Sequence, residues 1–163
     1  MTRVYVAAGG NMAPAVRLPQ ALAGLHAAFG ELQVSPCYAN PAFGFEGEDF
    51  YNLVVSFDTA LPLQEVLAHL HAIEEACGRA RHAAKWAPRA MDLDVLLYGE
   101  LVGEFPGAVL PRPDLVKRAY MLGPMADLAP QLQHPTLGAS MAALWAAFDK
   151  TGWQPRVVPL GEA

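Results

Sequence analysis

Two segments of helical periodicity, each lying between β-rich segments, leave few possible folds for this chain. Residues 15–29 and 61–77 carry apolar side chains three or four positions apart, which predicts two amphipathic helices. Runs rich in β-branched and aromatic residues predict the flanking strands. These strands are expected at residues 3–8, 31–38, 50–59 and 90–98, with a glycine turn after the first.

The resulting order, βαββαβ, favours an α+β fold: a ferredoxin-like sandwich with a mainly antiparallel sheet and helices packed on it. Residues 100–102 are expected to form a hairpin return, and residues 117–128 and 139–148 two further helices. The chain has 163 residues and shows neither an internal repeat nor a linker. A single domain over residues 1–163 is therefore expected.

Composition favours a globular protein of the cytoplasm. Hydrophobic residues make up 53% of the chain and charged residues 17%, which argues against disorder. No apolar run is long enough to span a membrane, and the apolar start at residues 4–8 fits a buried strand better than a secretion signal. Cys37 and Cys77 lack the spacing of a redox pair and are expected to be free, buried thiols.

The charge is unevenly distributed. Seven of the eleven Lys and Arg residues lie between positions 79 and 118, where they outnumber the acidic residues by two, although the whole chain carries −5. A local basic concentration in an acidic protein indicates a small polyanionic ligand rather than a nucleic acid.

The residues expected to carry chemistry centre on Asp92 and Asp94. Residues two apart on a strand point to the same face, so both carboxylates would project together. Such a pair repels unless a cation lies between its members, and Mg²⁺ commonly binds one or two carboxylates together with substrate phosphates. A solvent-exposed Asp pair without function is the alternative; the arginines just upstream, Arg79, Arg81 and Arg89, favour phosphoryl transfer.

The basic segment 79–89 could be an ordinary solvated loop. Trp86 argues against this, because a large indole on a polar loop is costly to leave exposed. A lid that closes over ATP would bring its arginines to the phosphates. Asn52, in a run of aromatic and aliphatic residues, needs polar partners if it is buried, and the edge of a planar heterocycle could supply them.

Together these residues resemble the 6-hydroxymethyl-7,8-dihydropterin pyrophosphokinase family of folate biosynthesis. The resemblance runs from the first strand to about Leu128, and the segment KWAPRAMDLDVL looks like the family's signature. Six further matches occur in order: Gly9-Gly10-Asn11, Asn40-Pro41-Ala42-Phe43-Gly44, Phe50-Tyr51-Asn52, Ile73-Glu74, Gly78-Arg79-Ala80-Arg81 and Arg118-Ala119-Tyr120.

The resemblance implies transfer of pyrophosphate from ATP to the pterin hydroxymethyl group with release of AMP. Asp92 and Asp94 would hold two Mg²⁺ ions, and Arg79 and Arg89 would stabilise the migrating group. The residues implied to bind the pterin are Asn40, Phe43, Phe50, Asn52 and Tyr120. The residues implied to bind ATP are Glu74, Arg81, Trp86, Arg112 and Arg118. The expected protein is a monomer that binds these small molecules and neither nucleic acid nor membrane.

Several positions depart from the family pattern. Arg112 stands where the family typically has a histidine that touches ATP, and Gly107 stands where a basic residue is often found. Gly10, Ala42, Ala87 and Ala90 also differ from the usual residues. Two alternatives are therefore kept: a divergent paralogue that binds pterin or nucleotide without efficient turnover, and an interaction module with an incidental Asp pair. The histidines, including His71, are expected at the surface or beside the nucleotide rather than around zinc.

Overall fold

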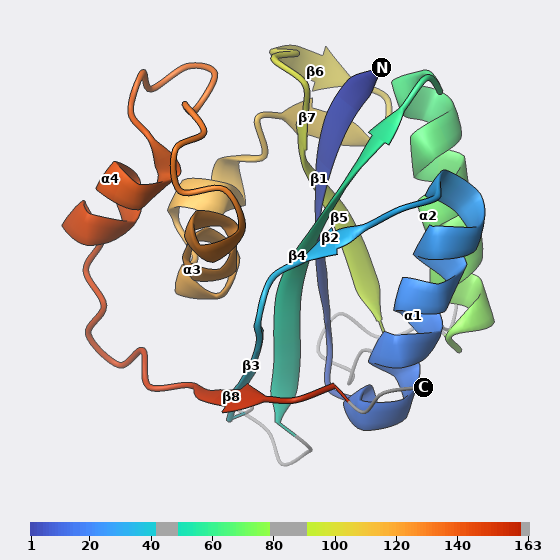
Figure 1. Cartoon of the computed structure of the whole chain (residues 1–163), viewed down its shortest axis with the longest axis horizontal. Coiled ribbons are helices and arrows are strands. Elements are labelled where there is room, and N and C mark those ends of the chain that lie inside the picture. The colour runs from blue at the N-terminus through green and yellow to red at the C-terminus, as the bar shows by residue number, and fades with distance from the viewer. Residues whose placement is uncertain (42–48, 79–90, 161–163) are drawn as a thin grey trace.

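An antiparallel sheet with helices on both faces forms the body of the molecule (Figure 1). The computed structural model describes residues 1–41, 49–78 and 91–160. The elements, in chain order, are β1 (Thr2–Gly10), α1 (Pro14–Phe29), β2 (Gln33–Val34), β3 (Cys37–Asn40), β4 (Phe50–Thr59), α2 (Leu63–Ala76), β5 (Asp92–Tyr98), β6 (Gly103–Phe105), β7 (Ala108–Leu110), the 3₁₀ turn η1 (Pro113–Val116), α3 (Ala119–Leu128), α4 (Met141–Ala147) and β8 (Arg156–Val158).

The strand order confirms the ferredoxin-like prediction. The main sheet runs β5–β1–β4–β3–β8, with β2 also paired to β4, and every pairing is antiparallel. The two long strands β1 and β4 lie at its centre and pair along their whole length, from Thr2 opposite Thr59 to Gly10 opposite Tyr51. β5 lies at one edge of this sheet, so one side of its backbone faces away from the neighbouring strand.

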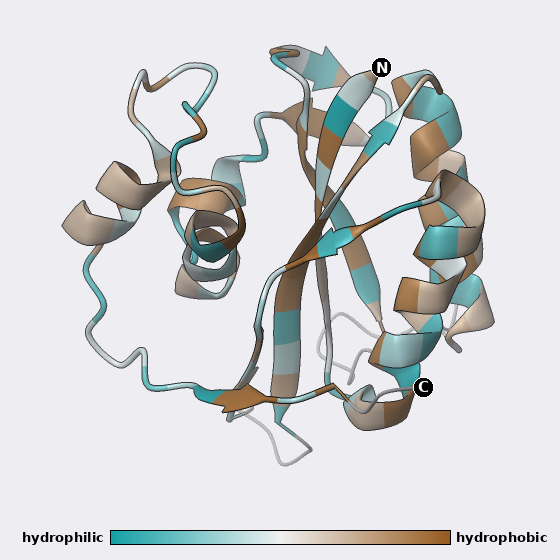
Figure 2. Cartoon of the chain, in the orientation of Figure 1, coloured by the Kyte–Doolittle hydropathy of each residue, from teal (hydrophilic) through white to brown (hydrophobic). Residues whose placement is uncertain are grey.

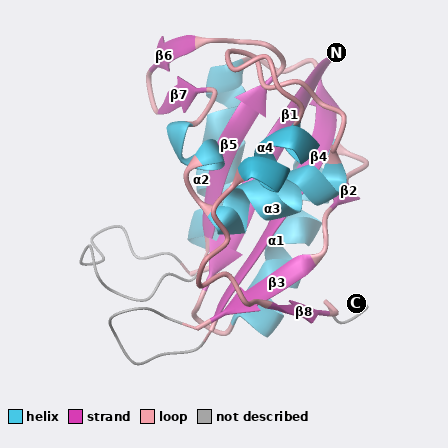
Figure 3. Cartoon of the chain, turned by 90° about the vertical axis from the view of Figure 1, so that its left-hand side faces the viewer, coloured by secondary structure: helices cyan, strands magenta, loops and turns pink. Residues whose placement is uncertain are grey.

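Helices cover the two faces of the sheet in separate layers. α1 and α2 pack on one face, and α3 and α4 lie on the other, as Figures 1 and 3 show from two directions. Alternation along the strands divides the core accordingly: Val55 and Phe57 point to the α1/α2 layer, whereas Val54 points to the α3/α4 layer. Figure 2 shows the central strands mainly in the hydrophobic colour where they cross between the layers.

The predicted second strand is divided. Val34 pairs with Val55, but Tyr38 pairs with Asn52. The chain therefore advances four residues between these pairs on the β2–β3 side and only three on β4. This extra residue is a β-bulge at Ser35-Pro36, where proline offers no N–H for the ladder. The Ser35 hydroxyl compensates by accepting a bond of 2.9 Å from the Val54 N–H.

Two other local predictions were wrong. The expected glycine turn after residue 8 is strand, because β1 continues through Gly9 and Gly10. The expected hairpin return at residues 100–102 is a connection, and the hairpin forms further on from β6 and β7, around a turn in which Gly107 has a φ of 80°. β8, which pairs with β3, was not predicted.

Candidate active site

A row of four residues crosses the sheet near the end of β1. Asp92 on β5 lies opposite Gly9 on β1, Gly9 lies opposite Asn52 on β4, and Asn52 lies opposite Tyr38 on β3. Residues opposite one another on neighbouring strands share a face of the sheet. The metal-binding candidate and the pterin-binding candidate therefore share one face, separated only by a glycine.

Gly9 is the residue that makes room on this row. A Cβ atom at position 9 would lie 2.3 Å from the Asn52 Oδ1 atom, far inside van der Waals contact. The Asn52 carboxamide therefore occupies the space that a side chain on β1 would fill. The absence of a side chain at Gly9 thus lets a polar carboxamide lie over the central strand, where it could bond to the edge of a flat, polar ligand.

The two aspartates lie side by side on β5, as the sequence predicted. Their neighbours Leu93 and Val95 belong to the core beneath α1 and α2, so Asp92 and Asp94 face the α3 side. Both residues are half-buried. Within the described residues no cluster of three or more His, Cys, Asp or Glu side chains could enclose a metal ion. The pair fits an open Mg²⁺ site, in which a phosphate ligand supplies the remaining oxygens.

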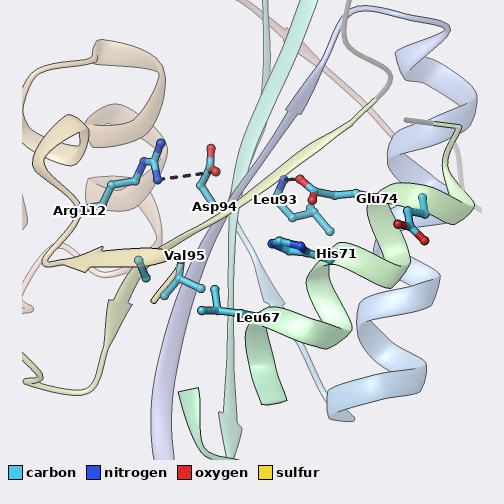
Figure 4. Close-up of a pocket in the computed structure, with 10 residues that line it drawn as sticks. Leu67, His71, Glu74, Leu93, Asp94, Val95 and Arg112 are labelled. Atoms are coloured by element: carbon cyan, nitrogen blue, oxygen red, sulfur yellow. Dashed lines mark hydrogen bonds and ion pairs between the residues drawn. The ribbon is translucent and has the colours of Figure 1, made fainter. Parts of the chain in front are cut away.

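Arg112 reaches the aspartate pair from the segment that follows β7. Its Nη1 atom lies 3.7 Å from Asp94 Oδ1 (Figure 4), and its Nη2 atom lies 3.5 Å from Asp114 Oδ2. Its backbone N–H donates to the Leu96 carbonyl at 2.9 Å, which fixes the start of the side chain. The buried Nε–H finds no acceptor among the described residues. Arg112 therefore has donor capacity left for an anion beside Asp94.

Tyr120 and Arg118 lie at the start of α3, on the same side of the sheet. Burial raises the pKa of Tyr120, the nearby Arg118 charge lowers it, and the charges of Asp114 and Asp94 raise it further. These influences place the phenol ring in the electrostatic field of the aspartate site. Tyr120 as a whole is 37% exposed, so the residue is accessible to a ligand.

The expected pterin-binding residues on the sheet also gather here. Asn40 on β3 lies opposite Phe50 on β4, one row beyond Asn52. These side chains share the face that carries Asp92. Next to them, the Tyr38 hydroxyl donates a hydrogen bond to Asp127 of α3. Burial, together with that bond, raises the pKa of Tyr38 to about 12.

A pocket of about 360 Å³ lies along the edge of β5 (Figure 4). Its lining comes from α2, β5, the β6–β7 turn and Arg112. The lining residues are Leu67, His71, Glu74, Glu75, Leu93, Asp94, Val95, Gly107, Ala108 and Arg112. Asp94 and Arg112 thus belong both to this pocket and to the aspartate site.

Glu74, expected near the nucleotide, lies within this pocket. It is only 5% exposed, and its Oε2 atom accepts a hydrogen bond of 2.8 Å from the Leu93 N–H. His71, one helical turn earlier, also lines the pocket. The sequence placed His71 at the surface or beside the nucleotide, but it did not identify Leu67 and Val95. Apolar residues at helical or strand spacing look the same in the sequence whether they line a pocket or fill the core.

Five expected site residues lie outside the described residues. They are Phe43, Arg79, Arg81, Trp86 and Arg89. Cys37 and Cys77 are buried and free, as expected, and burial raises the pKa of the Cys37 thiol to about 11. In the described part of the chain, no helix is both long enough and apolar enough to cross a bilayer.

Comparison with known proteins identifies the family of this chain. The family described as 7,8-dihydro-6-hydroxymethylpterin-pyrophosphokinase (HPPK) matches residues 5–130. A Pseudomonas aeruginosa protein named 2-amino-4-hydroxy-6-hydroxymethyldihydropteridine pyrophosphokinase is 38% identical over 154 residues, covering 92% of this chain and 94% of its own length. A Bacillus subtilis protein of the same name is 32% identical over 139 residues and covers 83% of each chain.

A solved structure shows the same fold. The crystal structure of wild-type Plasmodium falciparum HPPK-DHPS with SDX-DHP superposes with a TM-score of 0.69 at 14% identity. The match covers 90% of this chain but only 43% of that longer one. Because the family match spans most of the residues and the relatives are similar over nearly their full length, this chain belongs to the HPPK family.

Proposed function

We propose that this chain transfers pyrophosphate from ATP to the hydroxymethyl group of 6-hydroxymethyl-7,8-dihydropterin, releasing AMP, as a step of folate biosynthesis. The row Asp92–Gly9–Asn52 carries this proposal, because it joins a cation-binding pair to a polar, flat-ligand site without an intervening side chain. The named relatives support this enzyme over a paralogue that binds without efficient turnover.

In the proposed reaction, the pterin hydroxyl oxygen forms a bond to the β-phosphorus of ATP. The bond from that phosphorus to the oxygen bridging the α-phosphorus breaks, AMP leaves with this oxygen, and the hydroxyl proton is released. Mg²⁺, when bound, would neutralise phosphate charge and orient the phosphate oxygens. Asp92 and Asp94 would hold it, two ions being expected from the family resemblance.

The residues on the α3 side would bind the pterin. Asn52 would donate and accept hydrogen bonds at the edge of the heterocycle, with Asn40 beside it. Phe50 and Tyr120 would stack on the two faces of the ring. Phe43, from outside the described residues, is proposed to complete this site. Holding the hydroxyl near the metal-bound phosphate is the main catalytic contribution that such positioning makes.

The pocket on the α2 side would bind ATP. Its apolar lining, including Leu67 and Val95, suits an adenine ring, and Arg112 in the same lining suits a phosphate. Arg118, with Arg81 and Trp86, is proposed to contact the nucleotide as well. Arg79 and Arg89 are proposed to stabilise the charge that develops on the migrating group.

The expectations on oligomeric state, location, domain extent and ligands are also proposals. The protein is proposed to act as a monomer in the cytoplasm, as one domain over residues 1–163, on these small molecules and without nucleic acid. Size-exclusion chromatography with light scattering would test the first of these statements.

Replacing Asp94 tests the metal assignment. Asp94→Ala should lower the rate of AMP formation by roughly 100-fold or more, because even outer-shell partners of metal sites typically carry 10- to 100-fold effects. Circular dichroism should show an unchanged fold, since Asp94 is half-buried at an edge strand. Asp58→Ala is the matched control, because Asp58 pairs with Arg3 at the far end of the sheet. Wild-type turnover by Asp94→Ala would refute the assignment.

A further inference from the structure

Glu74 occupies a position where an apolar residue would be expected. The buried positions of α2 are Leu63, Val66, Leu70 and Glu74, so the carboxylate continues an aliphatic stripe. Within the described residues it is the only buried acidic side chain. Removing a carboxylate from water is costly, and such a group persists only where its surroundings compensate. A buried charge at this place therefore indicates a specific task.

The hydrogen bond from Leu93 identifies what Glu74 holds. β5 is an edge strand, and Leu93 lies opposite Ala8 of β1. The Leu93 N–H donates to Glu74 Oε2 rather than to β1, so this backbone group points outward from the sheet. The carboxylate therefore takes the place of a neighbouring strand at this one residue of the edge.

Leu93 is the residue between the two proposed metal ligands. Its side chain lies in the core beneath α1 and α2, on the side of Glu74, whereas Asp92 and Asp94 face α3. Glu74 therefore approaches β5 from the α2 side, whereas Asp92 and Asp94 face α3. It can influence the two aspartates only through the backbone of β5. Mg²⁺ tolerates little departure from octahedral geometry, so the rotation of β5 about its own axis determines how well the pair can bind the ion.

We infer that Glu74 is a positioning residue: through its bond to the Leu93 N–H it sets the direction in which Asp92 and Asp94 present their carboxylates. This inference rests on the proposed function, since it assumes that the pair binds Mg²⁺. It assigns Glu74 a role that depends on its capacity to accept a hydrogen bond and not on its charge.

Two substitutions of similar size separate these properties. Glu74→Gln keeps an acceptor oxygen and loses the charge, whereas Glu74→Met loses both and restores an aliphatic stripe. Met removes a buried charge but also the acceptor of the Leu93 N–H, two effects of opposite sign on stability, so urea unfolding of Glu74→Met is measured to show that the variant is folded under the assay conditions. Glu65→Ala is the control, since it removes the same charge from an exposed position on α2.

Glu74→Met should raise the Mg²⁺ concentration needed for half-maximal kcat by roughly 10-fold or more. Glu65→Ala should stay close to the wild type, and Glu74→Gln should need less Mg²⁺ for half-maximal kcat than Glu74→Met. Amide exchange gives a readout without turnover: the Leu93 amide should exchange faster in Glu74→Met but not in Glu74→Gln. Mg²⁺ with a non-hydrolysable ATP analogue should raise the Tm of Glu74→Met less than it raises the Tm of Glu74→Gln.

Two results would overturn the positioning role. One is Glu74→Gln being as impaired as Glu74→Met, which would assign the effect to charge. The other is Glu74→Met with wild-type Mg²⁺ dependence while Asp94→Ala is inactive. If Asp94→Ala itself kept Mg²⁺-dependent turnover, the metal assignment would fail, and the positioning role would fail with it.

Discussion

Single residues on the central strand β1 separate the proposed pterin-binding residues from the proposed metal-binding residues. β1 carries Ala7 and Gly9 on the face that holds the proposed site, between the longer side chains of β4 and β5. Because β1 lies between these strands, any large residue there would stand between the proposed pterin-binding and metal-binding residues. Small residues on β1 thus lie between the polar residues Asn52 and Asp92 of the two flanking strands.

Gly9→Ala should weaken pterin binding. The added Cβ would lie 2.3 Å from Asn52 Oδ1, so the carboxamide must move away from its position in the row. We expect a raised KM for the pterin and little change in the KM for ATP, measured by AMP formation, because the proposed nucleotide pocket lies on the α2 side of β5.

A double-mutant cycle checks the cause. Asn52→Ala removes the atom that Gly9→Ala would displace, so the two changes should have less than additive effects on the KM for the pterin. Full additivity would show that Gly9 and Asn52 do not share this space.

At the scale of elements, a histidine organises the connection between α3 and α4. His134 is 5% exposed, and its Nδ1 atom accepts hydrogen bonds of 3.2 Å from the Thr136 and Leu137 N–H groups. The backbone N–H of His134 donates to the Ala139 carbonyl at 2.8 Å. An accepting Nδ1 requires the neutral ring. The connection therefore depends on His134 being unprotonated.

Acid should destabilise this connection before the rest of the fold. Burial lowers the pKa of His134 from its ordinary value of 6.5, so the unfolded chain binds this proton first as the pH falls. The stabilisation is complete above pH 6.5 and decreases below it, down to the lowered pKa of the folded state. The free energy of unfolding by urea should therefore fall between pH 7.5 and pH 5.5.

His134→Asn tests the assignment, since it keeps an acceptor and cannot titrate. We expect this variant to show a flatter dependence of unfolding free energy on pH, whereas the exposed His69→Gln should keep the wild-type slope. A wild-type slope in His134→Asn would assign the effect to other groups.

At the scale of the whole molecule, one sheet supports both cores, so the layers should unfold together. Phe57 of β4 is fully buried and stacks on Phe29 of α1 with the ring centroids 4.1 Å apart. Val54, on the same strand, belongs to the core beneath α3 and α4. Damage to one core is therefore transmitted through β4 to the other.

Phe57→Ala should lower the free energy of unfolding by about 3–5 kcal/mol, the usual cost of removing a buried aromatic ring. In a Trp86→Phe background, fluorescence reports Trp145 and Trp153, and Trp145 packs with the α3/α4 core. The fluorescence and circular dichroism transitions in urea should shift together. A fluorescence transition that stayed at its original urea concentration would show that the layers unfold independently.

Local periodicity was enough to predict α1, α2, α3 and the full extent of β4, because side-chain alternation and helical spacing depend on residues a few positions apart. The same rule placed Asp92 and Asp94 on one face. The motifs also identified Asn52 and Arg112 as candidates. Local rules failed at Ser35-Pro36, at Gly9-Gly10 and in the segment before β6, where pairing with distant strands decided the backbone path.

By itself, the amino-acid sequence determined the helices, most strands, the family and the candidate residues for binding Mg²⁺, since these follow from residue type and short-range spacing. Only the tertiary structure decided that Gly9 lies between Asn52 and Asp92, that α2 reaches the edge of β5, and that Glu74 bonds to Leu93. These relations join residues far apart in the chain. They depend on strand order and register, which are set when the two cores pack against the sheet.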